Sequence, residues 1–218
     1  QFLDSLGIDA AFFDAEQDRC YCSRCCAAVR MPDVLDGDRA DGHCYEVPKG
    51  WCGFGLEIPP RAKALKIFSS DWVHAFHGCP ASVVPSILLE GSLLMPGDLL
   101  INGTPLPNRL TKGGEHRIGV YTSPSIKYAE LDIYTKPRSW KGREVRVVLQ
   151  CKQKIETFAS QGETIGWNRR WNYAPISRFF DNDKIERFTK RKGTIIPYRV
   201  LVGLGVTTRD HELAGAQA

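Results

Sequence analysis

The chain has 218 residues, of which 43% are hydrophobic and 25% charged, and its formal net charge is +4. This composition excludes a low-complexity or disordered chain and supplies enough apolar material for one catalytic-size domain with an appendage. The mild positive charge permits a nucleic-acid partner without indicating one. No apolar run approaches the roughly 20 residues that span a bilayer, so we expect no membrane partner. The absence of an initiator Met and of a secretory leader indicates part of a longer protein.

The first 58 residues are expected to form an N-terminal helix and a Cys-rich element. Residues 1–19 are acidic and amphipathic, which favours a short packing helix. Residues 20–52 hold most of the cysteines, and residues 50–58 alternate in polarity until Pro59 and Pro60, which predicts a strand. We therefore divide the chain into residues 1–58, a main domain over 59–208, and a frayed tail over 209–218.

The main domain is predicted to mix strands and helices. The expected strands cover 72–78, 118–122, 144–150 and 194–206. A helix over 80–89 has Pro80 near its start and Gly91 as its stop, and a second helix is opened by Ser123 as N-cap with Pro124 at its first position. Residues 96–118 and 161–183 are loop-like. This order indicates an α+β fold, and neither a Rossmann glycine motif nor a P-loop occurs.

Cysteine clustering predicts a metal site. Four thiols fall within seven residues, at Cys20, Cys22, Cys25 and Cys26, where they cannot easily pair with one another as disulfides. Such clustering fits zinc in a reducing compartment, so we expect an intracellular protein, in the cytoplasm or the nucleus. The expected ligands of this structural zinc are Cys20, Cys22, Cys25, Cys26 and Cys52, with one of the adjacent pair idle. His43 and Cys44 remain candidates, and buried free cysteines or a redox role are the alternatives.

A His-Gly pair ends the predicted strand over 72–78. The phrase Trp-Val-His-Ala-Phe-His-Gly resembles the first catalytic strand of the H-Y-E class of ADP-ribosyltransferases, the poly(ADP-ribose) polymerase-like group. That resemblance implies an ADP-ribosyltransferase-like split β-sheet core with flanking helices, and NAD as substrate. It also implies that His77 hydrogen-bonds the adenosine-side ribose, while the Gly78 backbone pairs with the nicotinamide amide. A structural role for His77 is the alternative, and His74 is interpreted as structural.

Two further phrases carry the rest of this resemblance. Gly-Val-Tyr-Thr-Ser-Pro over 119–124 places Tyr121 on the middle letter, with Ser123 assigned to the cofactor site. The resemblance implies that Tyr121 and a second aromatic ring, Tyr128 or Tyr134, sandwich the nicotinamide. Glu186, ahead of the strand over 194–206, matches the third letter. Glu163 is an alternative carboxylate, and Tyr121 as a core residue or Glu186 as a surface ion partner are the simpler interpretations.

The order of several phrases along the chain resembles the C-terminal domain of the neuralized-like protein 4 group. They are the cysteine cluster, Gly50-Trp51-Cys52, Ala75-Phe76-His77-Gly78, Ser123-Pro124 with Tyr128-Ala129, Gly162-Glu163-Thr164-Ile165-Gly166 and Ile185-Glu186. That resemblance implies a transferase fold within a larger ubiquitin-linked or scaffold protein.

The chemistry that these residues would perform is mono-ADP-ribosyl transfer. Cleavage of NAD at the nicotinamide bond builds positive charge on the ribose, which a carboxylate such as Glu186 stabilises. We expect the acceptor to be a protein or a nucleic acid. A catalytically inactive interaction module is the alternative, and a zinc-dependent nucleic-acid binder is a third hypothesis.

Interleaved Trp and Arg side chains follow Glu163, at Trp167, Arg169, Arg170 and Trp171. Such a pattern can stack on nucleobases, but a lid over bound cofactor or plain packing is the favoured interpretation. The basic tract from Lys184 to Lys192 keeps a nucleic-acid acceptor open, although charge runs of this kind are usually solvated surface.

Overall fold

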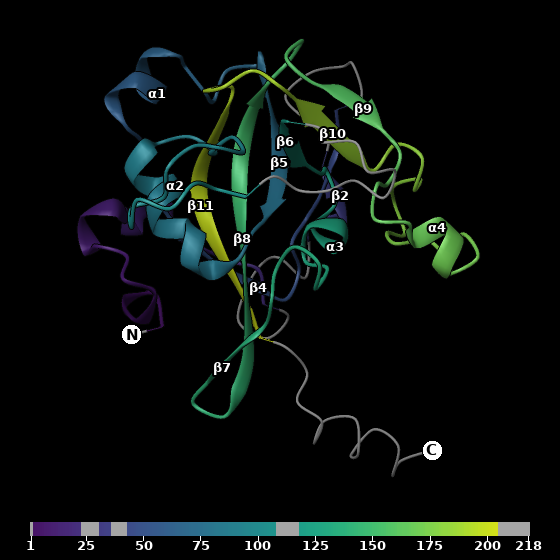
Figure 1. The fold of residues 1–218 in the computed structure, drawn as a ribbon, viewed down its shortest axis with the longest axis horizontal. Helices are drawn as coiled ribbons and strands as arrows, with labels where there is room; N and C mark the ends of the chain where they lie inside the picture. Colours follow the sequence, from purple (N-terminus) through teal and green to yellow (C-terminus); the bar gives the residue numbers. More distant parts are fainter. Residues whose placement is uncertain (1, 23–30, 36–42, 108–117, 205–218) are drawn as a thin grey trace.

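The computed structural model describes residues 2–22, 31–35, 43–107 and 118–204. Within them the fold is mixed α+β, with short helices around antiparallel sheets (Figure 1), so the predicted class is confirmed. The largest sheet has the order β1-β4-β11-β8-β5, and β7 pairs with β8. Its strands are β1 (Arg19–Cys20), β4 (Trp51–Gly55), β5 (Trp72–Gly78), β7 (Arg138–Trp140), β8 (Arg143–Lys154) and β11 (Ile195–Leu204).

Two smaller sheets and four short α-helices complete the described fold. The three-stranded sheet has the order β6-β10-β9, and a two-stranded ribbon pairs β2 with β3. These strands are β6 (Val120–Thr122), β9 (Ala159–Gln161), β10 (Glu186–Thr189), β2 (Val34–Leu35) and β3 (Tyr45–Glu46). The α-helices are α1 (Pro60–Ala64), α2 (Val84–Glu90), α3 (Ile126–Ala129) and α4 (Trp167–Arg170). Single 3-10 turns cover Asp4–Leu6, Ala10–Phe12, Ala15–Gln17 and Ala81–Val83.

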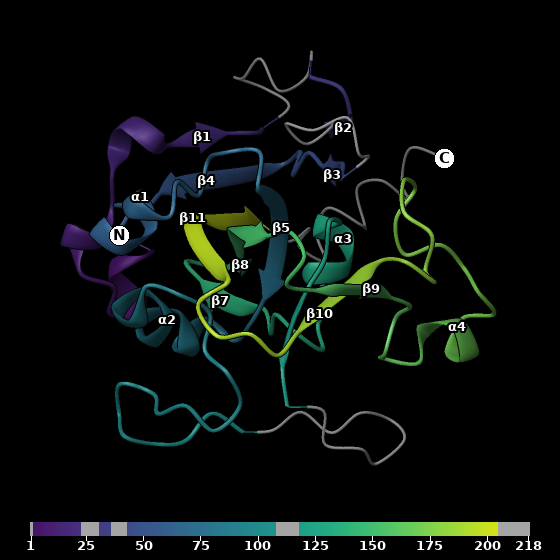
Figure 2. The ribbon, with the colours of Figure 1, turned by 90° about the horizontal axis from the view of Figure 1, so that it is seen from above.

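The core lies on both faces of the large sheet because side chains alternate along its central strands. Leu149 of β8 packs into a cluster with α2, whereas its neighbour Val148 packs with Ile126 of α3 on the opposite face. Figure 2 shows α2 and α3 on either side of the sheet. The long apolar strands β8 and β11 are therefore buried on both sides and form a rigid platform for the residues at the end of β5.

A backbone bridge joins the large sheet to the three-stranded sheet. The Phe76 N–H donates to the Ser123 carbonyl at 2.7 Å, and the Ser123 N–H donates back to the Phe76 carbonyl at 2.9 Å. Beyond this bridge β6 leaves β5 and pairs with β10, with Tyr121 opposite Phe188. The ends of β5, β6 and β10 are therefore held close together, although β10 begins 108 positions after β5 ends in the numbering.

Several predicted elements are confirmed. The strand over 72–78 is β5, α2 ends on Gly91 in the left-handed conformation (φ 72°), and the strands over 118–122, 144–150 and 194–206 correspond to β6, β8 and β11. The strand expected over 50–58 is shorter, as β4. Residues 161–183 are irregular apart from α4. The predicted loop over 96–118 has no helix or strand over 96–107, and its positions 108–117 lie outside the described residues.

Two predicted elements are wrong. The helix expected over 1–19 is replaced by separate 3-10 turns, because Asp9 and Asp14 accept hydrogen bonds from backbone N–H groups two residues ahead and so start new turns. The helix after β6 is capped by Ser125, not Ser123. The backbone N–H and carbonyl of Ser123 bond to Phe76, and its hydroxyl donates to the Ile185 carbonyl at 2.7 Å.

The boundary predicted at residue 58 falls inside the large sheet. Both β1 and β4 precede that residue, yet β4 pairs along β11 with Val202 opposite Cys52. The segment 1–58 thus contributes strands to the same sheet as β5 and β8. The tail over 209–218 lies outside the described residues. Within the described ranges, none of the helices combines the length and the apolar character that crossing a bilayer requires.

Candidate functional site

His77 lies near the carboxyl end of β5, facing the start of the smaller sheet. Its Nδ1 is 2.8 Å from the Tyr121 carbonyl oxygen. Because a carbonyl oxygen can only accept, Nδ1 carries the proton and Nε2 of the neutral ring is an acceptor. Burial lowers the pKa of His77, and the hydrogen bond to Tyr121 opposes this only in part. The imidazole is therefore neutral at neutral pH, with one ring nitrogen able to accept a hydrogen bond.

A cavity of about 370 Å³ adjoins His77, within the size range of small-molecule sites. All six residues that the sequence assigned to NAD line this His77 cavity: His77, Gly78, Tyr121, Ser123, Tyr128 and Tyr134. The remainder of its wall is mainly apolar and comes from β5 and the segment through α2, from residues 94–107, and from β6 and the segment through residue 136. Lys136 is the one Lys or Arg among its described lining residues. The wall thus combines His77 and three tyrosines with a mainly apolar remainder.

Gly78 is pressed against the segment that follows β6. A Cβ atom at this position would lie 2.1 Å from the Ala129 carbonyl oxygen and 2.7 Å from Cβ of Tyr134. Real Cβ atoms do not approach other atoms so closely, so only glycine allows α3 and the following turn to pack on the end of β5. This contact brings the rings of Tyr128 and Tyr134 beside His77, with 5.4 Å between their centroids.

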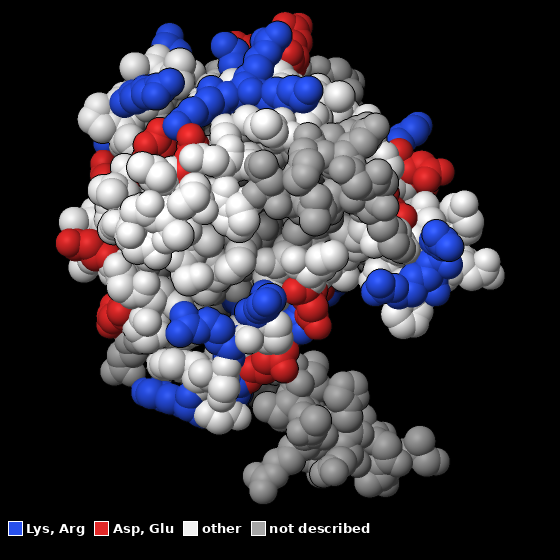
Figure 3. Space-filling view, viewed as in Figure 1, with Lys and Arg blue, Asp and Glu red and all other residues white. Residues whose placement is uncertain are grey.

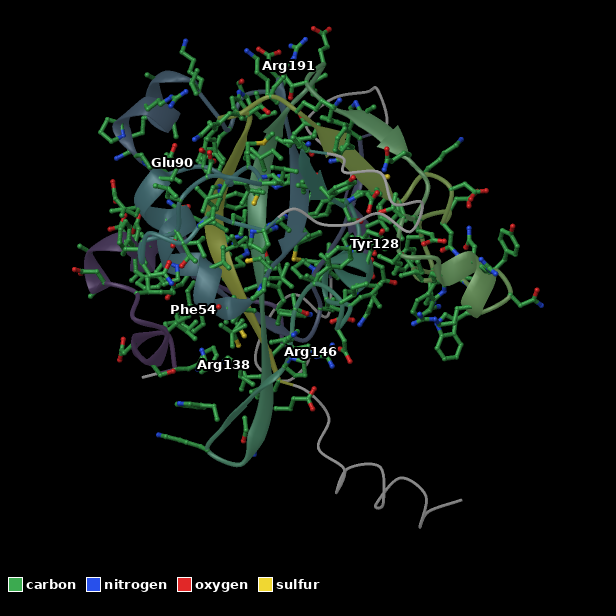
Figure 4. All side chains as sticks on the ribbon, in the orientation of Figure 1. Phe54, Glu90, Tyr128, Arg138, Arg146 and Arg191 are labelled. Atoms are coloured by element: carbon green, nitrogen blue, oxygen red, sulfur yellow. The ribbon has the colours of Figure 1, made fainter. Side chains whose placement is uncertain are left out.

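Glu186, the first residue of β10, is completely buried behind these tyrosines. Its Oε2 accepts a hydrogen bond from the Tyr128 hydroxyl at 2.6 Å and lies 3.2 Å from the Tyr134 hydroxyl. Its Oε1 accepts from Gln161 Nε2 at 2.7 Å, and the Thr164 hydroxyl is 3.0 Å from both oxygens. Burial, then the neighbouring Tyr134 and Glu186, raise the pKa of Tyr128, so its hydroxyl keeps its proton and donates. Figure 4 labels Tyr128 on α3.

The predicted triad therefore converges in part. His77 and Tyr121 share a backbone hydrogen bond and line one cavity, whereas Glu186 is one hydrogen bond behind its wall and contributes none of the lining. Gln161 and Thr164 were missed as partners of the carboxylate, since neither a Gln nor a Thr in a loop carries a local signal. In the Gly162-Glu163-Thr164 phrase it is the threonine, not the glutamate, that contacts Glu186.

Glu163, the alternative carboxylate, is engaged elsewhere. It accepts hydrogen bonds from the backbone N–H groups of Trp167 at 2.9 Å and Asn168 at 3.0 Å. It thus satisfies the otherwise unpaired N–H groups at the start of α4. Glu163 does not line the His77 cavity and does not contact Glu186 among the described hydrogen bonds.

The cysteine residues are only partly described. Cys20 and Cys52 lie directly opposite each other on β1 and β4, so their side chains share one face of the sheet. The Cys22 N–H lies 3.5 Å from the Cys20 Sγ. Cys25 and Cys26 lie outside the described residues, and in the described part of the chain no three His, Cys, Asp or Glu side chains are grouped to hold a metal.

The Trp and Arg residues of α4 do not cover the His77 cavity, which contradicts the lid interpretation as far as the described lining goes. Trp167, Arg170 and Trp171 instead line a second cavity. Comparison with known proteins adds no assignment, because no protein-family model matches the chain. What the fold and site define is an α+β domain with one tyrosine-lined cavity backed by a buried carboxylate.

Proposed function

We propose that the chain is an NAD-dependent mono-ADP-ribosyltransferase that uses the His77 cavity, in line with the resemblance to the H-Y-E class and the neuralized-like protein 4 group. The observation that carries the proposal is the meeting of segments far apart in sequence. His77 and Gly78 from β5, Tyr121 from β6, and Tyr128 and Tyr134 share one cavity. The hydroxyls of Tyr128 and Tyr134 both lie within hydrogen-bond distance of the Glu186 carboxylate on β10.

The lining residues fit a planar aromatic ring joined to a ribose. Tyr121, Tyr128 and Tyr134 offer ring faces, and offset stacking contributes about 0.5–1.5 kcal/mol beyond burial for each pair. Nε2 of His77 is free to accept from a ribose hydroxyl, because Nδ1 is committed to the Tyr121 carbonyl. In the reaction the bond between the ribose carbon and nicotinamide nitrogen breaks and its electron pair leaves with nicotinamide. The acceptor atom then bonds to that carbon and loses its proton.

Glu186 would oppose the positive charge that develops on the ribose. Its carboxylate exposes no surface, so it reaches substrate only when a tyrosine hydroxyl yields its place. Gln161 and Thr164 hold the other side of the carboxylate and fix its orientation. Removing a preorganised group that faces developing charge typically costs about 100- to 1,000-fold in turnover.

The test measures nicotinamide release from labelled NAD and, separately, NAD binding by calorimetry. Glu186→Gln should reduce turnover about 100-fold while NAD still binds, and His77→Ala should weaken binding. Glu163→Gln is the matched control, because that carboxylate caps α4 and should leave nicotinamide release near the starting level. No NAD binding by the unaltered protein would refute the proposal.

A catalytically inactive interaction module is the second candidate, and the state of Glu186 favours it. A carboxylate buried completely and held by Tyr128, Gln161 and Thr164 is also what a purely structural role requires. In that case Glu186→Gln would lower stability, and neither the starting protein nor the variant would release nicotinamide. Such a module would act within a larger ubiquitin-linked or scaffold protein.

We also propose a structural zinc at the β1–β4 edge. The opposed positions of Cys20 and Cys52 on β1 and β4 fit two of the four ligands that zinc takes. Cys22, with Cys25 or Cys26, would complete the set.

A further inference from the structure

A second cavity, of about 340 Å³, lies between α4 and the turn that follows α3. We call it the α4 cavity. Its apolar walls come from Leu131, Ile133, Ile165, Trp167 and Trp171. Ile133 also lines the His77 cavity, so the two cavities share one wall residue. Anything bound in the α4 cavity would therefore lie beside the proposed NAD site.

Two tryptophans form the aromatic wall of this cavity: Trp167 is fixed by a hydrogen bond, and Trp171 is exposed to solvent. The rings of Trp167 and Trp171 lie 5.6 Å apart at an interplanar angle of 39°. The Trp167 indole N–H donates to the Ala174 carbonyl at 2.8 Å, which fixes that ring. Trp171, in contrast, is 54% exposed, so one large aromatic surface faces solvent at the mouth of the cavity. Packing explains Trp167 but leaves the exposed face of Trp171 unaccounted for.

Acidic and basic side chains both line the α4 cavity, with Glu130 and Asp132 beside Arg146 and Arg170. The acids that line it are compensated locally, since Asp132 pairs with Arg146 at 2.5 Å and Glu130 pairs with Lys127 at 2.8 Å. Arg169 and Arg170 of α4 carry the remaining charge: both are exposed and neither forms an ion pair with any described residue. Figure 3 shows blue side chains over α4 at the right of the molecule.

The other basic tract is less suited to a nucleic-acid partner. Lys192, in the tract from Lys184 to Lys192, lies 3.1 Å from Asp98 and 3.5 Å from Glu90. Arg187 is buried and donates to the His74 carbonyl at 2.8 Å. Neither of these two side chains therefore offers free positive charge to a partner.

We propose that the α4 cavity binds single-stranded nucleic acid, with a base stacked on Trp171 and phosphates at Arg169 and Arg170. Exposed aromatic rings beside unpaired arginines are the combination that single strands use, because every base has a π-face and every phosphate a charge. A cavity of this size suits one base. The assignment of the bound strand as the ADP-ribose acceptor rests on the proposed function, whereas the binding itself does not.

The test is fluorescence anisotropy with labelled ten-nucleotide strands of dT and of U, at several salt concentrations and without NAD. Trp171→Ala should weaken binding about tenfold or more, and Trp171→Phe should recover much of the loss, because a smaller ring still stacks. Arg170→Ala should lower the slope of log affinity against log salt by about 0.7, the contribution of one phosphate contact.

Arg138→Ala is the matched control for charge, because Arg138 is exposed on β7, far from α4 (Figure 4). It should leave the affinity within about twofold. Three results would each overturn the proposal. They are equal losses of affinity from Arg138→Ala and Arg170→Ala, an affinity that Trp171→Ala leaves unchanged, and binding of an acidic peptide in place of the strand. Strand binding together with an absence of NAD binding would sustain the nucleic-acid site and refute the transferase separately.

Discussion

Glu186 shows how much of this site depends on single hydrogen bonds. Tyr128→Phe removes a hydroxyl that donates to its carboxylate at 2.6 Å in a fully buried environment. We expect the free energy of unfolding to fall by about 1–3 kcal/mol, since a buried acceptor loses a partner. Urea denaturation measures this. Tyr173→Phe, at a 70% exposed position, is the control and should change little. Equal effects in the two variants would contradict the burial argument.

Gly78 permits a close approach that any side chain would block. Gly78→Ala should cost about 1–3 kcal/mol of stability, because its Cβ would lie 2.1 Å from the Ala129 carbonyl oxygen. Gly162→Ala is a matched control, since a Cβ there meets its nearest neighbour, Cα of Asp183, at 3.4 Å. Thermal unfolding of both variants compares them. Similar melting temperatures would mean that α3 can shift away from β5.

The sequence predicted which side chains line the His77 cavity, but it did not predict the hydrogen bonds that connect them. His77, Tyr121 and Tyr128 stand beside recognisable neighbours, so their phrases carried the prediction. The support of Glu186 by Gln161 and Thr164 arises from long-range pairing of β9 with β10, which no local pattern encodes. The roles of Glu163 and Ser123 were misjudged for the same reason, because a polar side chain takes whichever partner the fold brings to it.

Among the elements, α3 depends on one serine with two functions. The Ser125 hydroxyl accepts from the Tyr128 N–H at 3.4 Å and donates to the buried Glu46 carboxylate of β3 at 2.5 Å. Ser125→Ala should therefore cost about 1–3 kcal/mol, more than a cap alone, because Glu46 also loses a donor. Urea denaturation provides the value. Ser125→Thr keeps the hydroxyl and should recover part of it; a loss below about 0.5 kcal/mol would contradict the dual role.

The β1–β4 edge should respond to metal removal if zinc is bound there. A strong chelator should lower the melting temperature, and Cys20→Ser or Cys52→Ser should abolish that response while reducing zinc content measured by elemental analysis. Cys79→Ser is the control for thiol loss, because Cys79 is buried in the core beside α2, away from this edge. Absence of stoichiometric metal from tag-free protein would exclude the zinc site.

Elements with strong periodicity were predictable, and those set by polar side chains were not. β5, β8 and β11 carry runs of apolar residues that a buried strand needs, whereas the amphipathic pattern of residues 1–19 is broken by Asp9 and Asp14 into short turns. The pairing order of the large sheet, in which β4 neighbours β11, has no local signature. Because β1 and β4 belong to the same sheet as β8 and β11, residue 58 separates strands of one sheet. Composition carries no sign of that pairing.

The stability of the whole molecule should decline in mild acid. Burial lowers the pKa of His74 from 6.5 to about 3, with Lys152 and Arg199 acting in the same direction. Between these two pKa values the unfolded chain binds a proton at His74 and the folded chain does not. The free energy of unfolding therefore falls by up to about 1.4 kcal/mol for each pH unit lowered. His74→Gln removes this contribution. The difference in unfolding free energy between the two proteins, measured from pH 7 to pH 4, should therefore narrow or reverse; a constant difference would contradict it.

The position of β8 has a consequence for measuring ligands. β8 is paired on both sides, by β11 and β5, with β7 continuing beside its first residues, and most of its residues are buried. Its amide protons should exchange with deuterium only through global opening, whereas those of α4, a single turn at the periphery, exchange through local fluctuation. A bound strand should therefore slow isotope uptake at α4 through its local contacts, whereas uptake at β8 changes only as far as binding raises the stability of the whole fold.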